Sequence, residues 1–117
     1  MLTHADLNQF TGTEQWYQHP FNKKITFTDG VHYVAEEGKA FWLLDAIVSH
    51  QTNKKVRKEE FQVWKLTVNQ EDNSGLLVCQ DGDYNEIIRQ EIEFTDFPLS
   101  EIIIWLTDNV LLLPSKY

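Results

Sequence analysis

Only one cysteine, Cys79, occurs in the 117-residue chain. A single thiol cannot close an internal disulfide or form a thiolate metal cluster, which favours a reducing compartment. Long apolar runs are also missing: none reaches the ~20 residues that a membrane helix needs, and the N-terminus has no basic segment followed by an apolar one. We therefore expect a cytoplasmic protein with no membrane segment.

Basic residues are scarce as well. Ten Lys and Arg stand against eighteen Asp and Glu, a formal net charge of −8, and such a field repels a phosphate backbone unless the cations gather on one face. The one basic cluster, in residues 53–60 (NKKVRKEE), also contains two Glu and is typical of a solvated loop. Nucleic acid is therefore disfavoured as a partner, whereas a basic protein partner suits the charge.

Glycine is rare and dispersed. Its five copies lie singly in turns, so the chain has no phosphate-binding glycine-rich loop, no dinucleotide fingerprint and no Gly-x-Ser-x-Gly nucleophile elbow. The four histidines, at positions 4, 19, 32 and 50, lack the spacing of metal ligands. Cys79 lies in an apolar run, where a free cysteine behaves as a small buried hydrophobe. We expect no cofactor and no resident metal.

One segment begins like a calcium loop, with Asp81, Asp83 and Asn85 in its first, third and fifth positions. Glu86 then stands where the loop needs glycine, and Ile92 stands where it needs a bidentate glutamate. The pattern excludes a helix-loop-helix calcium site and favours a polar hairpin turn.

The residues that are present indicate one domain over residues 1–117. Hydrophobic residues make up 42% of the chain and aromatic residues 13%, enough for a single core. The strongest helical pattern covers residues 38–51, where apolar side chains recur at steps of three and four. A short helix is predicted over residues 3–10, with Thr3 or Asp6 as its N-cap.

The strands are predicted from alternating or β-rich stretches. The dipeptide Asp29-Gly30 predicts a tight hairpin turn between two short strands. The strands are expected over residues 24–28, 31–36, 61–68, 76–80 and 86–94, with two more around the turn at 107–109. The prediction is an α+β fold, in which an antiparallel sheet of five to seven strands packs on one main helix (38–51) beside a short N-terminal helix.

A five-residue motif, Ile-x-Phe-Thr-Asp, occurs twice, as ITFTD in residues 25–29 and as IEFTD in residues 92–96. In each copy Ile and Phe lie two apart on one side of a strand, and Asp is suited to open the following turn. Different residues follow the two Asp. We therefore interpret the repeat as the end of a strand and not as a duplicated ligand site.

The candidate catalytic residues are three acids, Asp29, Asp45 and Asp96, which border turns or the aromatic helix. Two carboxylates that meet in space would raise the pKa of one of them, as acid or base catalysis requires. This gives one hypothesis, a hydrolase that uses paired Asp carboxylates with or without a metal. For Asp45 the alternative is an ordinary helix-face acid beside Ser49, and whether the chain is an enzyme stays open.

The aromatic residues give a second hypothesis, a small acidic binding module without catalytic activity, which we favour. Trp16, Tyr17, Tyr84 and Tyr117 lie in segments predicted as loops or ends, and exposed Trp and Tyr supply contact area with a polar handle. Their alternative role is packing over the edge of the sheet. The protein partner is unidentified, and a homodimer through the sheet or its aromatic face is a further hypothesis.

Seven short blocks, in order along nearly the whole chain, resemble those of a domain-of-unknown-function family of small bacterial proteins. The blocks are FTGTE (10–14), TDG (28–30), WLLD (42–45), FQVWKL (61–66), DG (81–82), TDFP (95–98) and LPS (113–115). Lys116 departs from the acidic residue that the resemblance leads us to expect there. The resemblance implies a bacterial, single-domain protein and carries over no catalytic or binding residue.

Overall fold

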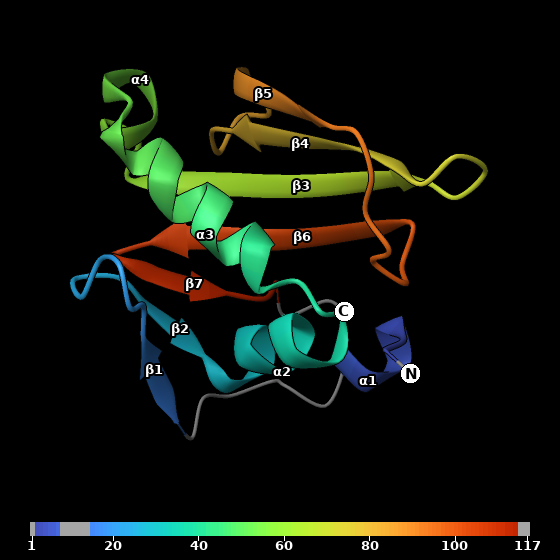
Figure 1. Cartoon of the computed structure of the whole chain (residues 1–117). Coiled ribbons are helices and arrows are strands. Elements are labelled where there is room, and N and C mark those ends of the chain that lie inside the picture. The colour runs from blue at the N-terminus through green and yellow to red at the C-terminus, as the bar shows by residue number, and fades with distance from the viewer. Residues whose placement is uncertain (1, 8–14, 115–117) are drawn as a thin grey trace.

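A computed structural model describes residues 2–7 and 15–114. Within them seven strands form one sheet, accompanied by four α-helices and one 3₁₀ helix (Figure 1). In chain order the elements are α1 (His4–Leu7), β1 (Trp16–Gln18), β2 (Thr26–Thr28), α2 (Asp29–Glu37), α3 (Phe41–Ser49), η1 (His50–Thr52), α4 (Lys54–Arg57), β3 (Phe61–Asn69), β4 (Ser74–Gln80), β5 (Glu86–Ile92), β6 (Glu101–Thr107) and β7 (Val110–Leu112). The predicted α+β class is confirmed.

The sheet is mixed and not purely antiparallel. Its strand order is β1-β2-β7-β6-β3-β4-β5. Every pair of neighbours is antiparallel except β2 and β7, which run parallel with Phe27 opposite Leu111. The predicted antiparallel sheet is therefore wrong at this pair. A parallel pair needs a long crossover connection, and local hydrophobic patterns do not show which distant strand will be the partner.

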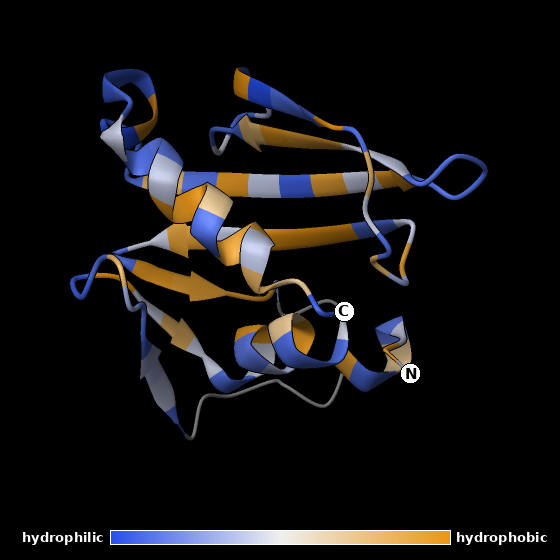
Figure 2. Cartoon of the chain, in the orientation of Figure 1, coloured by the Kyte–Doolittle hydropathy of each residue, from blue (hydrophilic) through white to orange (hydrophobic). Residues whose placement is uncertain are grey.

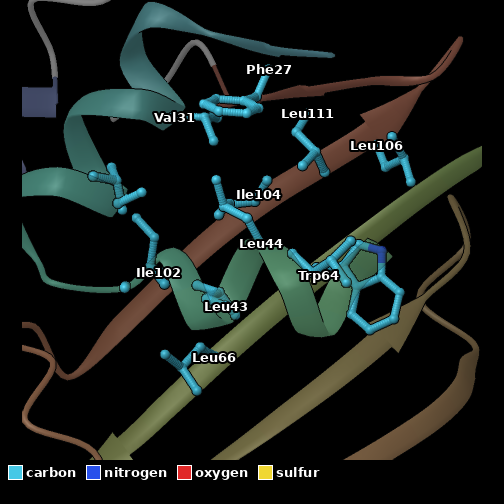
Figure 3. Packing of buried hydrophobic residues seen from close by; sticks show 14 of the residues in the cluster. Phe27, Val31, Leu43, Leu44, Trp64, Leu66, Ile102, Ile104, Leu106 and Leu111 are labelled. Atoms are coloured by element: carbon cyan, nitrogen blue, oxygen red, sulfur yellow. The ribbon is translucent and has the colours of Figure 1, made fainter. Parts of the chain in front are cut away.

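One face of the sheet forms the core. Along the two central strands the inward residues, among them Trp64 and Leu66 on β3 and Ile102 and Ile104 on β6, are almost completely buried. Figure 2 shows hydrophobic and polar residues alternating along β3. Helices α2 and α3 lie over the buried face (Figure 1), and Leu44 of α3 projects into the layer of strand side chains (Figure 3).

The predicted hairpin around Asp29-Gly30 is wrong, because helix α2 begins there. Thr28 is the N-cap: its hydroxyl accepts a hydrogen bond from the Val31 backbone N–H at 3.4 Å. Asp29 in the first turn suits the positive end of the helix dipole, and Val31 and Val34 lie on one buried face. The Asp-Gly dipeptide fits both a tight turn and a helix start, and the apolar spacing decides for the helix.

Two helices of nine residues, α2 and α3, cover the sheet in place of the single main helix predicted. The segment predicted over 38–51 contains α3, which begins at Phe41 and continues into η1. Of the N-terminal helix predicted over residues 3–10, the described part is α1, where the Thr3 hydroxyl accepts from the Asp6 N–H at 3.3 Å. Residues 8–10 lie outside the described residues. None of the helices in the described residues has the length and hydropathy of a membrane-spanning segment.

The charged segment 53–60, predicted as a loop, contains helix α4. The side-chain oxygen of Asn53 caps this helix by accepting from the Lys55 N–H at 2.9 Å. Val56 is completely buried and anchors the turn to the core, whereas the Lys and Arg side chains around it are exposed. The prediction missed the helix because one apolar residue among seven polar ones gives no periodic pattern.

The other strand predictions are confirmed in place. β3 and β4 cover the predicted 61–68 and 76–80, and β5 ends at Ile92, two residues before the predicted end. β6 and β7 meet at a tight turn whose central residues, Asp108 and Asn109, have positive φ values of 51° and 61°. Positive φ at both central positions is what a type I′ hairpin requires.

The repeated motif contains β2 in its first copy and begins at the last residue of β5 in its second. In both copies the shared structural feature is a hydrogen bond to Thr and not to Asp. The Thr28 hydroxyl accepts from the N–H of Val31, and the Thr95 hydroxyl accepts from the N–H of Phe97 at 3.2 Å. Asp29 begins a helix and does not open a turn. The two copies therefore share a local backbone cap and no ligand chemistry.

A buried amide holds α3 and α4 against β3. The Oε1 of Gln62 accepts from the indole N–H of Trp64 at 2.9 Å, and its Nε2 donates to the Val56 carbonyl at 3.0 Å. Gln62 and Gln51 are hydrogen-bonded amide to amide at 2.9 Å, and Gln51 also donates to the Ile47 carbonyl of α3. Among the described residues no buried side-chain polar atom lacks a partner, so this network fixes strand and helices without an unpaired group.

Gly38 allows α2 to pack closely against the loop that follows β5. A Cβ at this position would lie 2.7 Å from the Phe97 ring and 2.7 Å from the Val34 carbonyl oxygen. We expect Gly38→Ala to lower the free energy of unfolding by about 1–3 kcal/mol, because a buried ring and a helix backbone would have to shift.

Gly82→Ala is the matched control, because the atom nearest to its Cβ, in Phe61, lies 3.8 Å away. This change should alter the free energy of unfolding by less than ~0.5 kcal/mol. Urea denaturation measures both variants. A Gly38→Ala protein as stable as the parent would contradict the close packing.

Candidate functional site

A hollow of about 260 Å³ opens between the loop that joins β1 to β2 and the N-terminal half of α3. Its wall is mostly apolar and contains two polar groups that converge, a histidine and an aspartate. It is lined by His19, Pro20, Phe21, Phe27, Phe41, Leu44 and Asp45. An apolar hollow with a few convergent polar groups is the usual form of a binding site. We refer to it as the aromatic pocket.

Hydrogen bonds fix the loop on one side of the pocket. The His19 N–H donates to the Ile25 carbonyl at 2.9 Å, which extends the pairing of β1 with β2. Asn22 makes the turn: its side-chain oxygen accepts from the Lys24 N–H at 3.1 Å, and its carbonyl accepts from the Ile25 N–H at 3.0 Å. The loop therefore holds Phe21 near its tip, with 77% of the residue exposed.

His19 and Asp45 join this loop to α3. The Nε2 of His19 lies 2.9 Å from Oδ1 of Asp45, and its Nδ1 accepts from the Phe21 backbone N–H at 3.1 Å. A backbone N–H can only donate, so the hydrogen of the neutral ring is on Nε2 and points to the carboxylate. The His19 side chain is 2% exposed and that of Asp45 is 46% exposed. The buried His19 therefore holds one oxygen of the carboxylate, while the Asp45 side chain remains partly open to solvent.

An array of stacked rings supports the pocket. Tyr17 on β1 lies against His32 of α2, with ring centres 4.0 Å apart and planes 8° apart. Both rings also stack with Phe27. Phe41 meets His32 edge-on at 6.0 Å and remains 46% exposed. The pocket rim is therefore backed by rings that keep Phe41 in place while much of it faces solvent.

The pocket combines ring faces with one fixed negative group. Within the described residues no Lys or Arg forms an ion pair with Asp45. The π face of an aromatic ring attracts a cation, and a carboxylate accepts strong hydrogen bonds from ammonium or guanidinium groups. The geometry therefore suits the end of a positively charged side chain.

The same pocket is lined by one carboxylate, that of Asp45, and not by the pair that the hydrolase hypothesis requires. The Phe21 N–H occupies the Nδ1 lone pair of His19. A general base needs a free lone pair within reach of the proton that it removes. In this arrangement His19 has no lone pair free to act as a base, and its contact with Asp45 joins the loop to α3.

The three candidate catalytic acids lie in three different elements. Asp29 begins α2 and accepts from the Gly30 N–H at 3.0 Å, Asp45 lies within α3, and Asp96 is exposed in the loop between β5 and β6. Across the described residues no hydrogen bond joins any two of these carboxyl groups. The paired-carboxylate hypothesis gains no support from these hydrogen bonds and stays a prediction.

The segment that begins like a calcium loop forms the predicted polar turn between β4 and β5. Oδ1 of Asp81 accepts from the backbone N–H groups of Asp83 and Asn85 at 2.8 and 3.0 Å. The bond from Asn85 is the main reason that the pKa of Asp81 lies below its usual range. In residues 2–7 and 15–114 no group of three His, Cys, Asp or Glu side chains is arranged to hold a metal ion.

The four candidate binding aromatics lie in different environments. Trp16 on β1 and Tyr84 in the turn between β4 and β5 are exposed. Tyr17 packs in the ring array, as its alternative role predicted, and Tyr117 lies outside the described residues. Of the three that the structure describes, none lines the aromatic pocket.

The sequence prediction selected Asp45 and missed its neighbours His19, Phe21 and Phe41. Two signals point to them. Phe21 follows His19-Pro20 within an otherwise polar turn, where a large apolar residue has no obvious core to enter. Phe41 stands four residues before Asp45, a spacing that places both on one side of a helix.

A larger hollow of about 670 Å³ lies between α4, the loop between β1 and β2, and the turn between β6 and β7. Its lining is mostly polar and carries charges of both signs, including Lys24, Arg57, Glu59, Glu60 and Asp108. Mixed charges of this kind do not select one class of ligand. The aromatic pocket is therefore the stronger candidate site.

The fold is a mixed sheet with helices on one face, and the site is an acidic pocket lined by aromatic rings. The chain belongs to a family of unknown function (DUF6876), whose model matches residues 1–117. This confirms the resemblance to a domain-of-unknown-function family. No curated protein and no solved structure matches the chain.

Asp45 should contribute to stability through the buried imidazole. Asp45→Ala leaves the Nε2–H of His19, whose side chain is 2% exposed, without an acceptor, and we expect a loss of about 1–3 kcal/mol in the free energy of unfolding. Asp45→Asn retains an oxygen at the same place and should lose less. Chemical denaturation measures the free energy of unfolding of each variant. An Asp45→Ala protein as stable as the parent would show that this hydrogen bond does not contribute to stability.

Cys79 should be unreactive in the folded protein. Burial, the largest effect, raises the pKa of the thiol to about 12, so almost no thiolate exists near pH 8, and the side chain is fully buried. We expect no reaction with Ellman's reagent until denaturant unfolds the chain, followed by one equivalent of released thiolate. Rapid reaction under native conditions would contradict this environment.

Proposed function

We propose that the chain is a small acidic binding module without catalytic activity, and that it holds a cationic side chain of a basic protein partner in the aromatic pocket. The observation that carries the proposal is the carboxylate of Asp45, which is fixed on one oxygen by His19 and is 46% exposed in a hollow lined by Phe21 and Phe41. Rings and a carboxylate around one hollow are the chemistry that binds ammonium or guanidinium groups.

Phe21 supports this proposal because folding does not explain its position. At 77% exposure it buries little apolar surface in the chain itself, and an aromatic side chain at a pocket rim gives a partner a large contact area. The hydrogen bonds of Asn22 already order the turn that carries Phe21. Binding therefore loses little conformational entropy at this loop.

The size and charge of the site also favour a side chain of a protein. At about 260 Å³ the pocket is smaller than the ~300–1,000 Å³ of most small-molecule sites. The formal net charge of −8 attracts a basic surface over distances up to the Debye length. The hydrolase alternative has less support, because no second carboxylate lines the pocket beside Asp45 and His19 has no free lone pair.

A titration of the ¹⁵N-labelled protein with n-butylammonium, the end of a lysine side chain, tests the proposal. We expect shifts of the Phe21 and Asp45 backbone amides with a Kd in the millimolar range (~1–10 mM), as a single ammonium contact allows. The neutral analogue 1-butanol should bind at least about threefold more weakly, and salt should weaken only the butylammonium interaction. Equal shifts with the two compounds would mean that the pocket recognises apolar groups and not cations.

Matched variants separate local charge from net charge. Asp45→Asn should weaken n-butylammonium binding about tenfold, because a charge-assisted hydrogen bond is lost. Asp83→Asn removes the same charge from the exposed turn between β4 and β5 and should leave binding unchanged. Phe21→Leu keeps apolar area but removes the ring, so it should weaken the ammonium more than the alcohol. If Asp83→Asn acts as strongly as Asp45→Asn, the effect belongs to the whole molecule and the site is wrong.

A further inference from the structure

The side chains of the aromatic pocket offer few hydrogen-bond acceptors to a bound group. Of the seven residues that line it, only His19 and Asp45 have polar side chains. Both ring nitrogens of His19 are engaged, one by the Phe21 N–H and the other by Asp45. Oδ1 of Asp45 takes part in that contact, whereas its Oδ2 has no hydrogen-bond partner among the described residues. One carboxylate with one free oxygen is therefore what the lining side chains offer to a donor.

A bare ammonium group needs more acceptors than this. It carries three N–H donors that diverge from one nitrogen, so a carboxylate on one side of it accepts from one of them with good geometry. The other two would face a wall that includes Phe27, Phe41 and Leu44, whose side chains contain no oxygen or nitrogen. An ammonium is strongly hydrated in water, and burying a donor without a hydrogen bond is unfavourable. Desolvation therefore offsets part of the attraction between Asp45 and an unmethylated lysine.

A guanidinium group matches the pocket less well again. It binds a carboxylate best when two parallel N–H groups reach both oxygens. Oδ1 of Asp45 is already engaged by the Nε2–H of His19 at 2.9 Å, so this two-pronged contact would compete with the buried imidazole. The five N–H donors of a guanidinium also lie in one rigid plane, and most of them would enter the pocket without a partner. The acceptor supply thus disfavours arginine.

We infer that the pocket selects the dimethylated form of a lysine side chain, an inference that rests on the proposed function and names the cation. Each methyl group replaces one N–H, so a dimethylammonium keeps the positive charge and has a single donor left. That donor matches the free oxygen of Asp45, and the two methyl groups contact the rings and Leu44. Aromatic rings around a methylated ammonium attract its charge without needing its N–H groups.

Asp45 sets the number of methyl groups. A trimethylammonium would bury more apolar surface than a dimethylammonium, but it has no N–H. The Asp45 side chain is 46% exposed in the free protein, so water can hydrogen-bond its free oxygen. A group that covers this oxygen and donates nothing removes the water without replacing its hydrogen bond. The pocket therefore prefers a tertiary ammonium to a quaternary one.

A series of three amines, titrated into the ¹⁵N-labelled protein, tests the inference. N,N-dimethylbutylammonium should shift the Phe21 and Asp45 amides with a Kd at least about fivefold lower than that of n-butylammonium, and at least about threefold lower than that of N,N,N-trimethylbutylammonium. If apolar area alone decided affinity, the trimethyl compound would bind best. That order would overturn the inference, and so would an n-butylammonium that binds as tightly as the dimethyl compound.

This failure differs from failure of the proposed function. The proposed function fails if n-butylammonium and the neutral 1-butanol shift the same amides equally. The inference alone fails if the ammonium compounds bind more tightly than the alcohol but methylation does not strengthen their binding.

Asp45→Asn tests whether the carboxylate selects the tertiary ammonium. An asparagine amide can keep its oxygen on His19, and its NH₂ group then faces the ligand as a donor. We expect the dimethyl and trimethyl compounds to bind this variant with Kd values within about twofold of each other. Asp83→Asn, in the exposed turn between β4 and β5, should keep the preference of the parent. A dimethyl preference that persists in Asp45→Asn would overturn the inference, and the amine series on the parent protein decides it if this variant does not fold.

A peptide comparison identifies the source of the cation. A short basic peptide with one dimethyllysine should bind at least about threefold more tightly than free N,N-dimethylbutylammonium, because its other cations meet the acidic surface. It should also bind more tightly than the same peptide without methylation, and equal affinities for the two peptides would overturn the inference. A methylated peptide no tighter than the free amine would support a dimethylammonium site but contradict the protein partner of the proposed function.

Discussion

The burial of Trp64 beneath α3 is the interaction on which the remaining structure depends. A buried indole N–H needs an acceptor, and Gln62, two residues earlier on the same face of β3, provides it. The amide of Gln62 in turn binds the backbone of α4 and the side chain of Gln51, which holds the end of α3. One large apolar residue therefore brings with it a polar network that sets the position of the helix on the sheet.

The position of α3 determines which of its side chains are exposed at the aromatic pocket. With its apolar side on β3 and β6, the helix turns Phe41 and Asp45 toward the loop between β1 and β2. His19 completes the connection from the other side, since both of its ring nitrogens are engaged. The aromatic pocket is thus a consequence of core packing and lies on rigid elements, which is the arrangement that keeps a recognition site in a defined geometry.

Features set by residues near one another in sequence could be predicted, and those set by distant contacts could not. The strand β3 and the turn at Asp108-Asn109 follow from local patterns, and both were predicted correctly. Helix α2 was mistaken for a hairpin because Asp29-Gly30 is compatible with both, although its cap and apolar spacing were readable. The parallel pairing of β2 with β7 and the contact of His19 with Asp45, 26 residues apart, have no local signal. For that reason Asp45 could be selected as a candidate while its role in a pocket could not.

The parallel pair also governs the order in which a nascent chain can assemble. The β3–β4, β4–β5 and β6–β7 pairs join strands that follow one another in the chain, so these hairpins can form early. β1 and β2 join the sheet only through β7, the last strand, so during synthesis the N-terminal hairpin has no strand to dock on until translation has passed Leu112. Because the loop between β1 and β2 forms one wall of the aromatic pocket, we expect the pocket to be complete only after β7 has been synthesised.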